Sequence, residues 1–223
     1  QLKDSLARCQ GKRVHVLGDT IVDTYAYCNP IGSSTSKPPP LAVKYDREQS
    51  FAGGAAIVSR HLKEAGAEVV FTTVLGDDSL KDFVLREMET HGVVCCPEVE
   101  SSRVTTQKNV FIADGYRVLK VDKVDNRPIS SKTLTAFASA LSNSEAEAFV
   151  FSDFSHGIFS KGTTQRLISA LPDGPLRVAD SQVASRWGNI LDFRGFDLIT
   201  PNEKEARFAL GDQDSVIRPL ALE

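Results

Sequence analysis

The chain has 223 residues, of which 41% are hydrophobic and 25% charged, proportions that are usual for a globular α/β protein. Its formal net charge of −3 gives no reason to expect a nucleic-acid partner. The sequence has neither a long apolar run nor a signal-peptide core, so we expect no membrane association and a cytoplasmic location. The four cysteines lack metal-site spacing and are expected to be reduced.

The first half of the chain predicts alternating strands and helices. A short strand over residues 13–17 ends at Gly18-Asp19, and a second carboxylate follows at Asp23. Residues 29–40 are rich in proline and serine, which predicts a surface loop. The elements expected next are a helix over 51–66, a strand over 69–75 and a helix from Ser79 that ends at Gly92.

The second half begins with a different pattern. Residues 104–113 and 116–124 are two β-prone runs separated by Asp114-Gly115, the strongest short-range signal for a hairpin. A hairpin among βα units predicts a projecting flap, which we expect to pack against residues 41–51. The alternation then resumes, with helices expected near 131–141, 161–171 and 203–210 and strands at 148–153, 176–180 and 197–200.

Adjacent glycines, Gly53 and Gly54, stand at the expected start of the helix over 51–66. Without a Cβ, the backbone there can lie close to a ligand, and the free N–H groups at a helix start favour polar groups. An isolated glycine pair is also consistent with a simple turn before a core helix.

Polar side chains follow four of the expected strands, namely Asp19, Asp153, Asp180 and Asn202. The carboxyl ends of parallel strands meet at one edge of a sheet, where open α/β sheets bind ligands. The pattern therefore predicts a polar cleft at this edge. The dinucleotide, P-loop, zinc-protease and serine-hydrolase motifs are all absent from the sequence.

These residues resemble the motifs of the ribokinase-like (PfkB) carbohydrate kinases, and within them the heptose-7-phosphate kinase domain of ADP-heptose synthesis. The matching segments are Gly18-Asp19-x-x-x-Asp23, Gly53-Gly54-Ala55-Ala56, Leu119-Lys120-Val121-Asp122 and Leu198 to Glu205. The resemblance implies a single, partial domain over 1–223. It would be a three-layer sandwich with a mostly parallel sheet and a β-lid from about 24–51 and 104–124.

The resemblance also implies roles for individual residues. The sugar or sugar phosphate would be bound by Asp19, Asp23, Lys44, Gly53, Gly54 and Asp153. ATP and Mg²⁺ would be bound near Asp180, Asn202 and Glu205, with Glu205 organising the metal. Positioning and charge neutralisation by such groups suit phosphoryl transfer. The lid is expected to form a homodimer surface, and the parent chain is expected to carry a fused nucleotidyltransferase domain.

Three departures from the family pattern leave a second interpretation open. Ile57 replaces a sugar-contacting Asn, Ser181-Gln182-Val183 replaces Pro-Lys-Gly, and the Gly-Ala-Gly-Asp motif that supplies the catalytic base is absent. The first interpretation is the sugar-binding portion of an ATP-dependent carbohydrate kinase, inactive by itself and incomplete at the C-terminus. The alternative is a non-catalytic sugar-binding or regulatory module; the retained Asn202 and Glu205 argue against it.

Overall fold

The computed structural model describes residues 2–31, 42–182, 190–214 and 216. In chain order, the elements are α1 Leu2–Cys9, β1 Arg13–Gly18, β2 Thr20–Pro30, β3 Val43–Gly54, α2 Ala55–Glu64, β4 Glu68–Gly76, α3 Ser79–Thr90, β5 Val94–Glu100, β6 Gln107–Ala113, β7 Tyr116–Lys123, α4 Ser131–Ser142, β8 Ala148–Asp153, α5 Thr164–Ser169, β9 Leu176–Ser181, the 3₁₀ helix η1 Ile190–Phe193, β10 Leu198–Ile199 and α6 Glu203–Leu210.

The main body is a sheet with helices on both faces. Its strand order is β10-β9-β8-β1-β4-β5, and every pairing is parallel. Alternate residues of β8 enter opposite core clusters: Phe149 and Phe151 pack with α4, α5 and η1, whereas Val150 packs with α2 and α3. The three-layer α/β sandwich predicted from the sequence is therefore confirmed.

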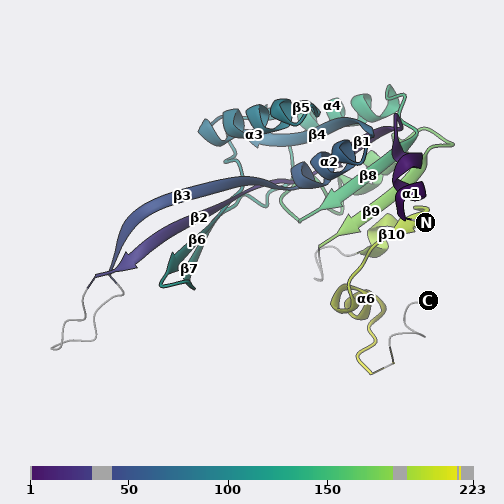
Figure 1. Cartoon of the computed structure of the whole chain (residues 1–223). Coiled ribbons are helices and arrows are strands. Elements are labelled where there is room, and N and C mark those ends of the chain that lie inside the picture. The colour runs from purple at the N-terminus through teal and green to yellow at the C-terminus, as the bar shows by residue number, and fades with distance from the viewer. Residues whose placement is uncertain (1, 32–41, 183–189, 215, 217–223) are drawn as a thin grey trace.

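A second sheet projects from the main body (Figure 1). Its order is β3-β2-β6-β7, with β6 and β7 joined at Asp114-Gly115. Asp114 has φ 50° and Gly115 φ 79°, the left-handed conformations that a tight hairpin turn needs. The predicted hairpin is confirmed. Its expected contact with residues 41–51 is wrong in detail, because β2 lies between the hairpin and β3.

The stretch around Gly53 and Gly54 differs from the expected helix start. Phe51–Gly54 continue β3, which pairs with β2 up to Thr20↔Gly54, and α2 begins only at Ala55. Gly54 has φ 62°, and a Cβ there would lie 2.4 Å from the backbone carbonyl oxygen of Asp19. The glycine is required because the chain turns from strand to helix against another backbone segment.

Four other elements were not predicted, namely α1, β2, β5 and the 3₁₀ helix η1. In the described part of the chain, no helix is long and apolar enough to cross a lipid bilayer. All four cysteines are free thiols.

Candidate functional site

Asp23 lies on β2 directly above Gly53 of β3. A Cβ on Gly53 would come within 2.4 Å of Asp23 Oδ2, so only glycine leaves room for this carboxylate. Burial raises the pKa of Asp23, and the charges of Lys108 and Lys120 lower it. The structure therefore brings together two of the predicted substrate-binding residues, with cations that the sequence analysis did not single out.

The register of the second sheet explains this grouping. Across β2, β6 and β7, Asp23 pairs with Lys108 and Lys108 pairs with Asp122. Two residues further along β2, Tyr25 pairs with Val110, and Val110 pairs with Lys120. Residues paired in this way share one face of a sheet. All of these residues except Asp122 line a cavity of about 440 Å³, together with Arg117, Val118 and Leu119.

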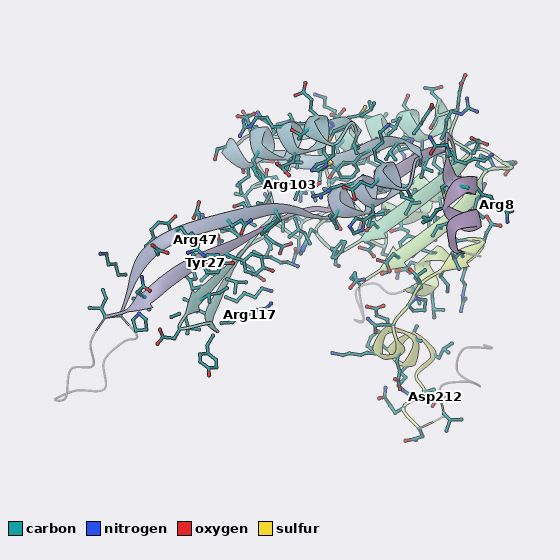
Figure 2. All side chains as sticks on the ribbon, viewed as in Figure 1. Arg8, Tyr27, Arg47, Arg103, Arg117 and Asp212 are labelled. Atoms are coloured by element: carbon teal, nitrogen blue, oxygen red, sulfur yellow. The ribbon has the colours of Figure 1, made fainter. Side chains whose placement is uncertain are left out.

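Three cations and one carboxylate thus line this cavity. Figure 2 shows Arg117, Tyr27 and Arg47 on the projecting sheet. The guanidinium carbon of Arg47 is 4.4 Å from the centroid of the Tyr27 ring. A carboxylate accepts hydrogen bonds from sugar hydroxyls, and Lys and Arg side chains bind phosphate. The cavity is therefore suited to a ligand that carries both hydroxyl and anionic groups.

Asp19 follows β1 and Asp153 ends β8, at the carboxyl edge of the main sheet. Neither lines this cavity, and both are buried, with exposed fractions of 2% and 5%. Asp153 accepts from the backbone N–H of Ser155 at 2.8 Å and from the Ser181 hydroxyl at 3.0 Å. Burial and, to a smaller extent, the charge of the nearby Asp19 raise the pKa of Asp153 to about 7. Burial also raises the pKa of Asp19, and this effect is larger than the opposite effect of the three backbone N–H groups that donate to its carboxylate. Their binding of sugar stays a prediction.

The predicted nucleotide-binding residues lie further along the same edge of the main sheet. Thr200 Oγ1 donates to Asp180 Oδ1 at 2.9 Å, which ties the end of β9 to the segment before α6. Because β10 is three strands from β1 in the sheet, this group lies roughly 14 Å from the end of β1. The two ends of the edge therefore could hold the two substrates of one transfer reaction.

Asn202 and Glu205 form a capping box at the start of α6. The Glu205 N–H donates to Asn202 Oδ1 at 3.0 Å, and the Asn202 N–H donates to Glu205 Oε2 at 2.9 Å. Glu205 is buried, and its other carboxylate oxygen accepts from Asn202 Nδ2. The pair therefore has a structural role in starting α6.

Direct Mg²⁺ binding by Glu205 does not fit this arrangement. Mg²⁺ needs oxygen ligands at about 2.1 Å in octahedral geometry, whereas both Glu205 oxygens are engaged in the capping box. Within the described ranges, no group of three or more His, Cys, Asp or Glu side chains could hold a metal ion. We therefore assign no reaction step to a metal held by this chain.

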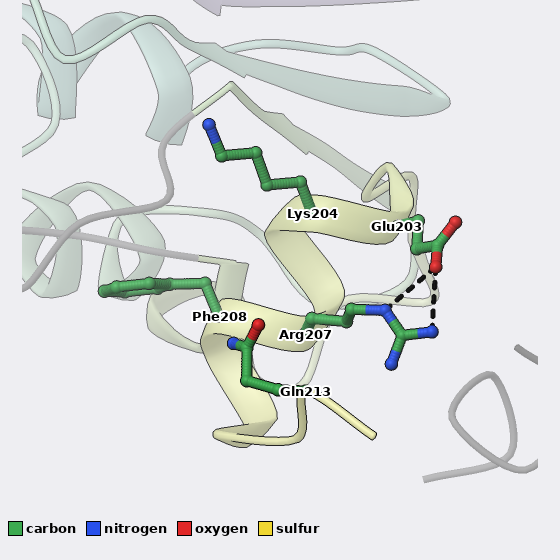
Figure 3. A pocket seen from close by; sticks show the side chains of 5 residues that line it. All are labelled: Glu203, Lys204, Arg207, Phe208 and Gln213. Carbon is green, nitrogen blue, oxygen red and sulfur yellow. Dashed lines mark hydrogen bonds and ion pairs between the residues drawn. The ribbon is translucent and has the colours of Figure 1, made fainter. Parts of the chain in front are cut away.

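A second cavity of about 400 Å³ is lined by side chains of α6 and by Gln213 (Figure 3). Arg207 turns back toward Glu203, with Nε 2.8 Å from Glu203 Oε1, whereas Lys204 and Phe208 point the other way. Phe208 is 40% exposed, and Leu198 in the neighbouring β10 is 52% exposed. This end of the fold thus presents apolar side chains at its surface.

Lys44 is the one predicted site residue that the structure places elsewhere. It pairs with Asn29, six residues along β2 from Asp23, which corresponds to roughly 20 Å. The assignment of Lys44 to the Asp23 site is therefore wrong for a single copy of the chain. The residues that sequence reasoning missed are Lys108, Arg117 and Lys120, which only the strand register brings to Asp23.

A family model described as pfkB family carbohydrate kinase matches residues 12–221. The chain belongs to the pfkB carbohydrate kinase family. The resemblance to this family that the sequence motifs indicated is therefore confirmed at the level of the family.

Curated relatives include proteins named Bifunctional protein HldE. The one from Paramagnetospirillum magneticum is 29% identical over 215 residues, covering 94% of this chain and 43% of the relative. The one from Campylobacter jejuni subsp. doylei is 28% identical over 203 residues, covering 90% of this chain and 42% of the relative. The chain thus spans less than half the length of these relatives.

Solved structures share the fold. Phosphofructokinase-2 from Escherichia coli, in complex with substrates and products, aligns with a TM-score of 0.70 at 15% identity, over 94% of this chain and 67% of that one. Ribokinase from Arabidopsis thaliana, complexed with ribose and ATP, aligns with a TM-score of 0.67 at 14% identity, over 96% and 67%. The ribokinase-like fold predicted from the sequence is confirmed.

Proposed function

We propose that this chain is the sugar-binding part of an ATP-dependent kinase whose substrate is a phosphorylated sugar. The observation that carries the proposal is the cavity beside Gly53, where Asp23 lies on one sheet face with Lys108, Arg117 and Lys120. Asp23 would accept hydrogen bonds from sugar hydroxyls, and the three cations would bind the phosphate already on the sugar. Heptose or surface-polysaccharide metabolism in the cytoplasm is the setting we favour, since the relatives are bifunctional HldE proteins.

ATP would bind at the other end of the same edge, beside Asp180 and the start of α6. Three residues separate β10 from α6, so the N-terminus of α6 lies near this edge, where backbone N–H groups outside the capping box would favour phosphate oxygens. Any Mg²⁺ would arrive on the ATP phosphates. The protein's contribution would be to align sugar and nucleotide and to exclude water.

The catalytic base and the remainder of the nucleotide site would lie on a longer parent chain, fused to a nucleotidyltransferase domain. The exposed apolar side chains of β10 and α6, Leu198 and Phe208 among them, support this as the surface that the remainder of the kinase domain covers.

The 223-residue chain alone is expected to transfer no phosphate from ATP. A missing general base by itself typically lowers a rate by 10²–10⁴-fold. The measurement is ADP release by the purified chain with a panel of sugar phosphates. Sugar-dependent ADP release above background would contradict this expectation and place a base within the chain.

The alternative function, a non-catalytic sugar-binding module, is favoured by Ile57 and by the absent base. The two functions differ in the full-length protein. A kinase converts the bound sugar phosphate and releases ADP, whereas a binding module retains the same affinity for the sugar and releases none. The measurement requires both a titration and an assay on the same preparation.

We further propose that the second sheet forms a homodimer through the face opposite the cavity. Tyr116 and Val121, which do not line the cavity, are exposed by 75% and 41%, and β7 is exposed along its whole length. Exposed apolar sheet faces of this kind are typical of association sites. Sedimentation of the chain should give a dimer that Val121→Lys converts to a monomer; a wild-type monomer at high concentration would reject the proposal.

A further inference from the structure

Residues 154–158, which follow β8, are held from one side by a buried carboxylate. Asp19 Oδ2 accepts from the backbone N–H of Phe154 at 2.9 Å and of His156 at 3.2 Å, and Oδ1 accepts from Ile158 at 3.5 Å. Since Asp19 is only 2% exposed, these bonds form inside the protein, where charge-assisted bonds are strong.

A buried guanidinium holds the same segment from the other side. Arg103 Nη1 donates to the carbonyl oxygens of Asp125 at 2.9 Å and His156 at 3.1 Å, and Nη2 donates to that of Arg127 at 2.8 Å. Its Nε is 3.1 Å from Glu100 Oε2, which balances the charge. Arg103 lies where the second sheet joins the main body (Figure 2).

The backbone between these two contacts is in a conformation that it would not adopt unaided. Ser155 has φ 61°, which is uncommon for a residue with a Cβ, and Gly157 has φ 108°. A Cβ at Gly157 would lie 2.3 Å from the Arg127 carbonyl oxygen. Such a conformation persists where surrounding contacts determine it, as Asp19 and Arg103 do here.

The segment carries two side chains with contacts outside it, Phe154 with the second sheet and His156 with the loop that follows β7. The Phe154 ring centroid is 6.0 Å from Lys108 Nζ, and Lys108 lines the proposed sugar cavity. His156 Nδ1 lies 2.9 Å from Asn126 Oδ1, an oxygen that can only accept, so the ring proton is on Nδ1. The buried Nε2 has no partner in the described part of the chain, and the charges of Lys108 and Asp122 act on the ring.

We infer that Asp19 and Arg103 are positioning residues for substrate binding. Together they clamp residues 154–158, and the clamped segment holds His156 at Asn126 and Phe154 against Lys108 of the second sheet, so that Lys108 stays at the cavity. Neither Asp19 nor Arg103 lines the cavity, so both act through the segment between them. The inference rests on the proposed function for its ligand, but the clamp itself is a property of the unliganded chain.

Two substitutions test the clamp, Asp19→Asn and Arg103→Lys. Asparagine has one acceptor oxygen where Asp19 has two. Lysine donates from a single nitrogen, so it cannot reproduce the bonds that Arg103 makes from both Nη1 and Nη2. Thr72→Val is the matched control, because Thr72 is equally buried and bonds His15 within the main sheet at 2.8 Å, away from the segment. Each protein is titrated calorimetrically with six- and seven-carbon sugar phosphates. The ring ¹⁵N signals of His156 are recorded by NMR without ligand, and a His156→Gln variant identifies which signals belong to this residue.

Both clamp variants should bind sugar phosphate at least about tenfold more weakly, the usual effect of losing charge-assisted bonds. Their His156 signals should move from a fixed Nδ1–H form to an average of both tautomers. Thr72→Val should lower the melting temperature while leaving affinity and His156 signals unchanged.

Wild-type His156 signals in both clamp variants would overturn the inference, and so would an equal loss of affinity in Thr72→Val. Failure of the wild-type chain to bind any sugar phosphate would instead reject the proposed function, and the His156 signals would still decide whether the clamp exists.

Discussion

Asp23→Asn is expected to weaken sugar phosphate binding by about 1.5–3 kcal/mol, the usual contribution of a hydrogen bond to a charged group. The substitution keeps the size of the side chain but removes its charge and one acceptor. Asp23 Oδ2 fills the space above Gly53, beside Lys108 and Lys120, where a sugar hydroxyl would meet it. Isothermal titration of both proteins with the same sugar phosphate measures the difference.

Asp46→Asn is the matched control for this experiment. Asp46 lies on β3 in the same sheet, is exposed, and pairs with Arg47 rather than lining the cavity. Its substitution should leave the affinity unchanged, and neither substitution should shift the melting temperature strongly, because neither residue belongs to the core. Equal affinities for wild type and Asp23→Asn would remove Asp23 from the site.

Asp153→Asn is expected to raise the free energy of unfolding by about 2–3 kcal/mol at pH 8.5, with little effect near pH 4.5. Burial raises the pKa of Asp153 to about 7, so the folded state of the wild type holds a proton that the unfolded state releases near pH 4. In the wild type, the protonated Asp153 therefore makes its full contribution to the free energy of unfolding at low pH. This contribution falls as the pH rises above 4 and is lost once the pH has passed 7. Asparagine never ionises, and it can retain the bonds to the Ser155 N–H and the Ser181 hydroxyl.

The comparison between variant and wild type isolates this one group. Burial lowers the pKa of His15 and of His156 to about 4, so both histidines make stability rise between pH 4 and 6.5 in either protein. Their contributions cancel in the difference. Urea unfolding from pH 4.5 to 8.5 should show a variant advantage that grows with pH, and Asp46→Asn should show none. A constant difference across this range would mean that Asp153 is ionised throughout.

Local signals in the sequence predicted most of the main body. Asp78 caps α3 by accepting from the Lys81 N–H, Gly211 ends α6 with φ 68°, and Asp114-Gly115 closes the hairpin. Each of these depends on a few neighbouring residues, which is why the sequence is sufficient to predict them. The strand-end carboxylates were placed at the correct edge of the sheet for the same reason.

The second sheet was harder to predict because its strands pair over long distances in sequence. Nothing local reveals that Thr20–Pro30 lies between Val43–Gly54 and Gln107–Ala113, and this register decides that Lys108 meets Asp23 while Lys44 does not. The three backbone N–H groups that Asp19 accepts from are also nonlocal, since they belong to residues 154, 156 and 158. A strand-end Asp at the ligand edge looks the same in sequence whether it binds a ligand or the backbone.

The most direct test of the proposed kinase is phosphorus NMR of the full-length protein that carries this chain. With ATP, Mg²⁺ and a seven-carbon sugar phosphate, we expect a second phosphate resonance on the sugar that grows in step with ADP. The corresponding unphosphorylated sugar should give neither, because the cations Lys108, Arg117 and Lys120 would lack their anionic partner. Equal turnover of the unphosphorylated sugar, or tight binding of the sugar phosphate without any ADP, would contradict the account.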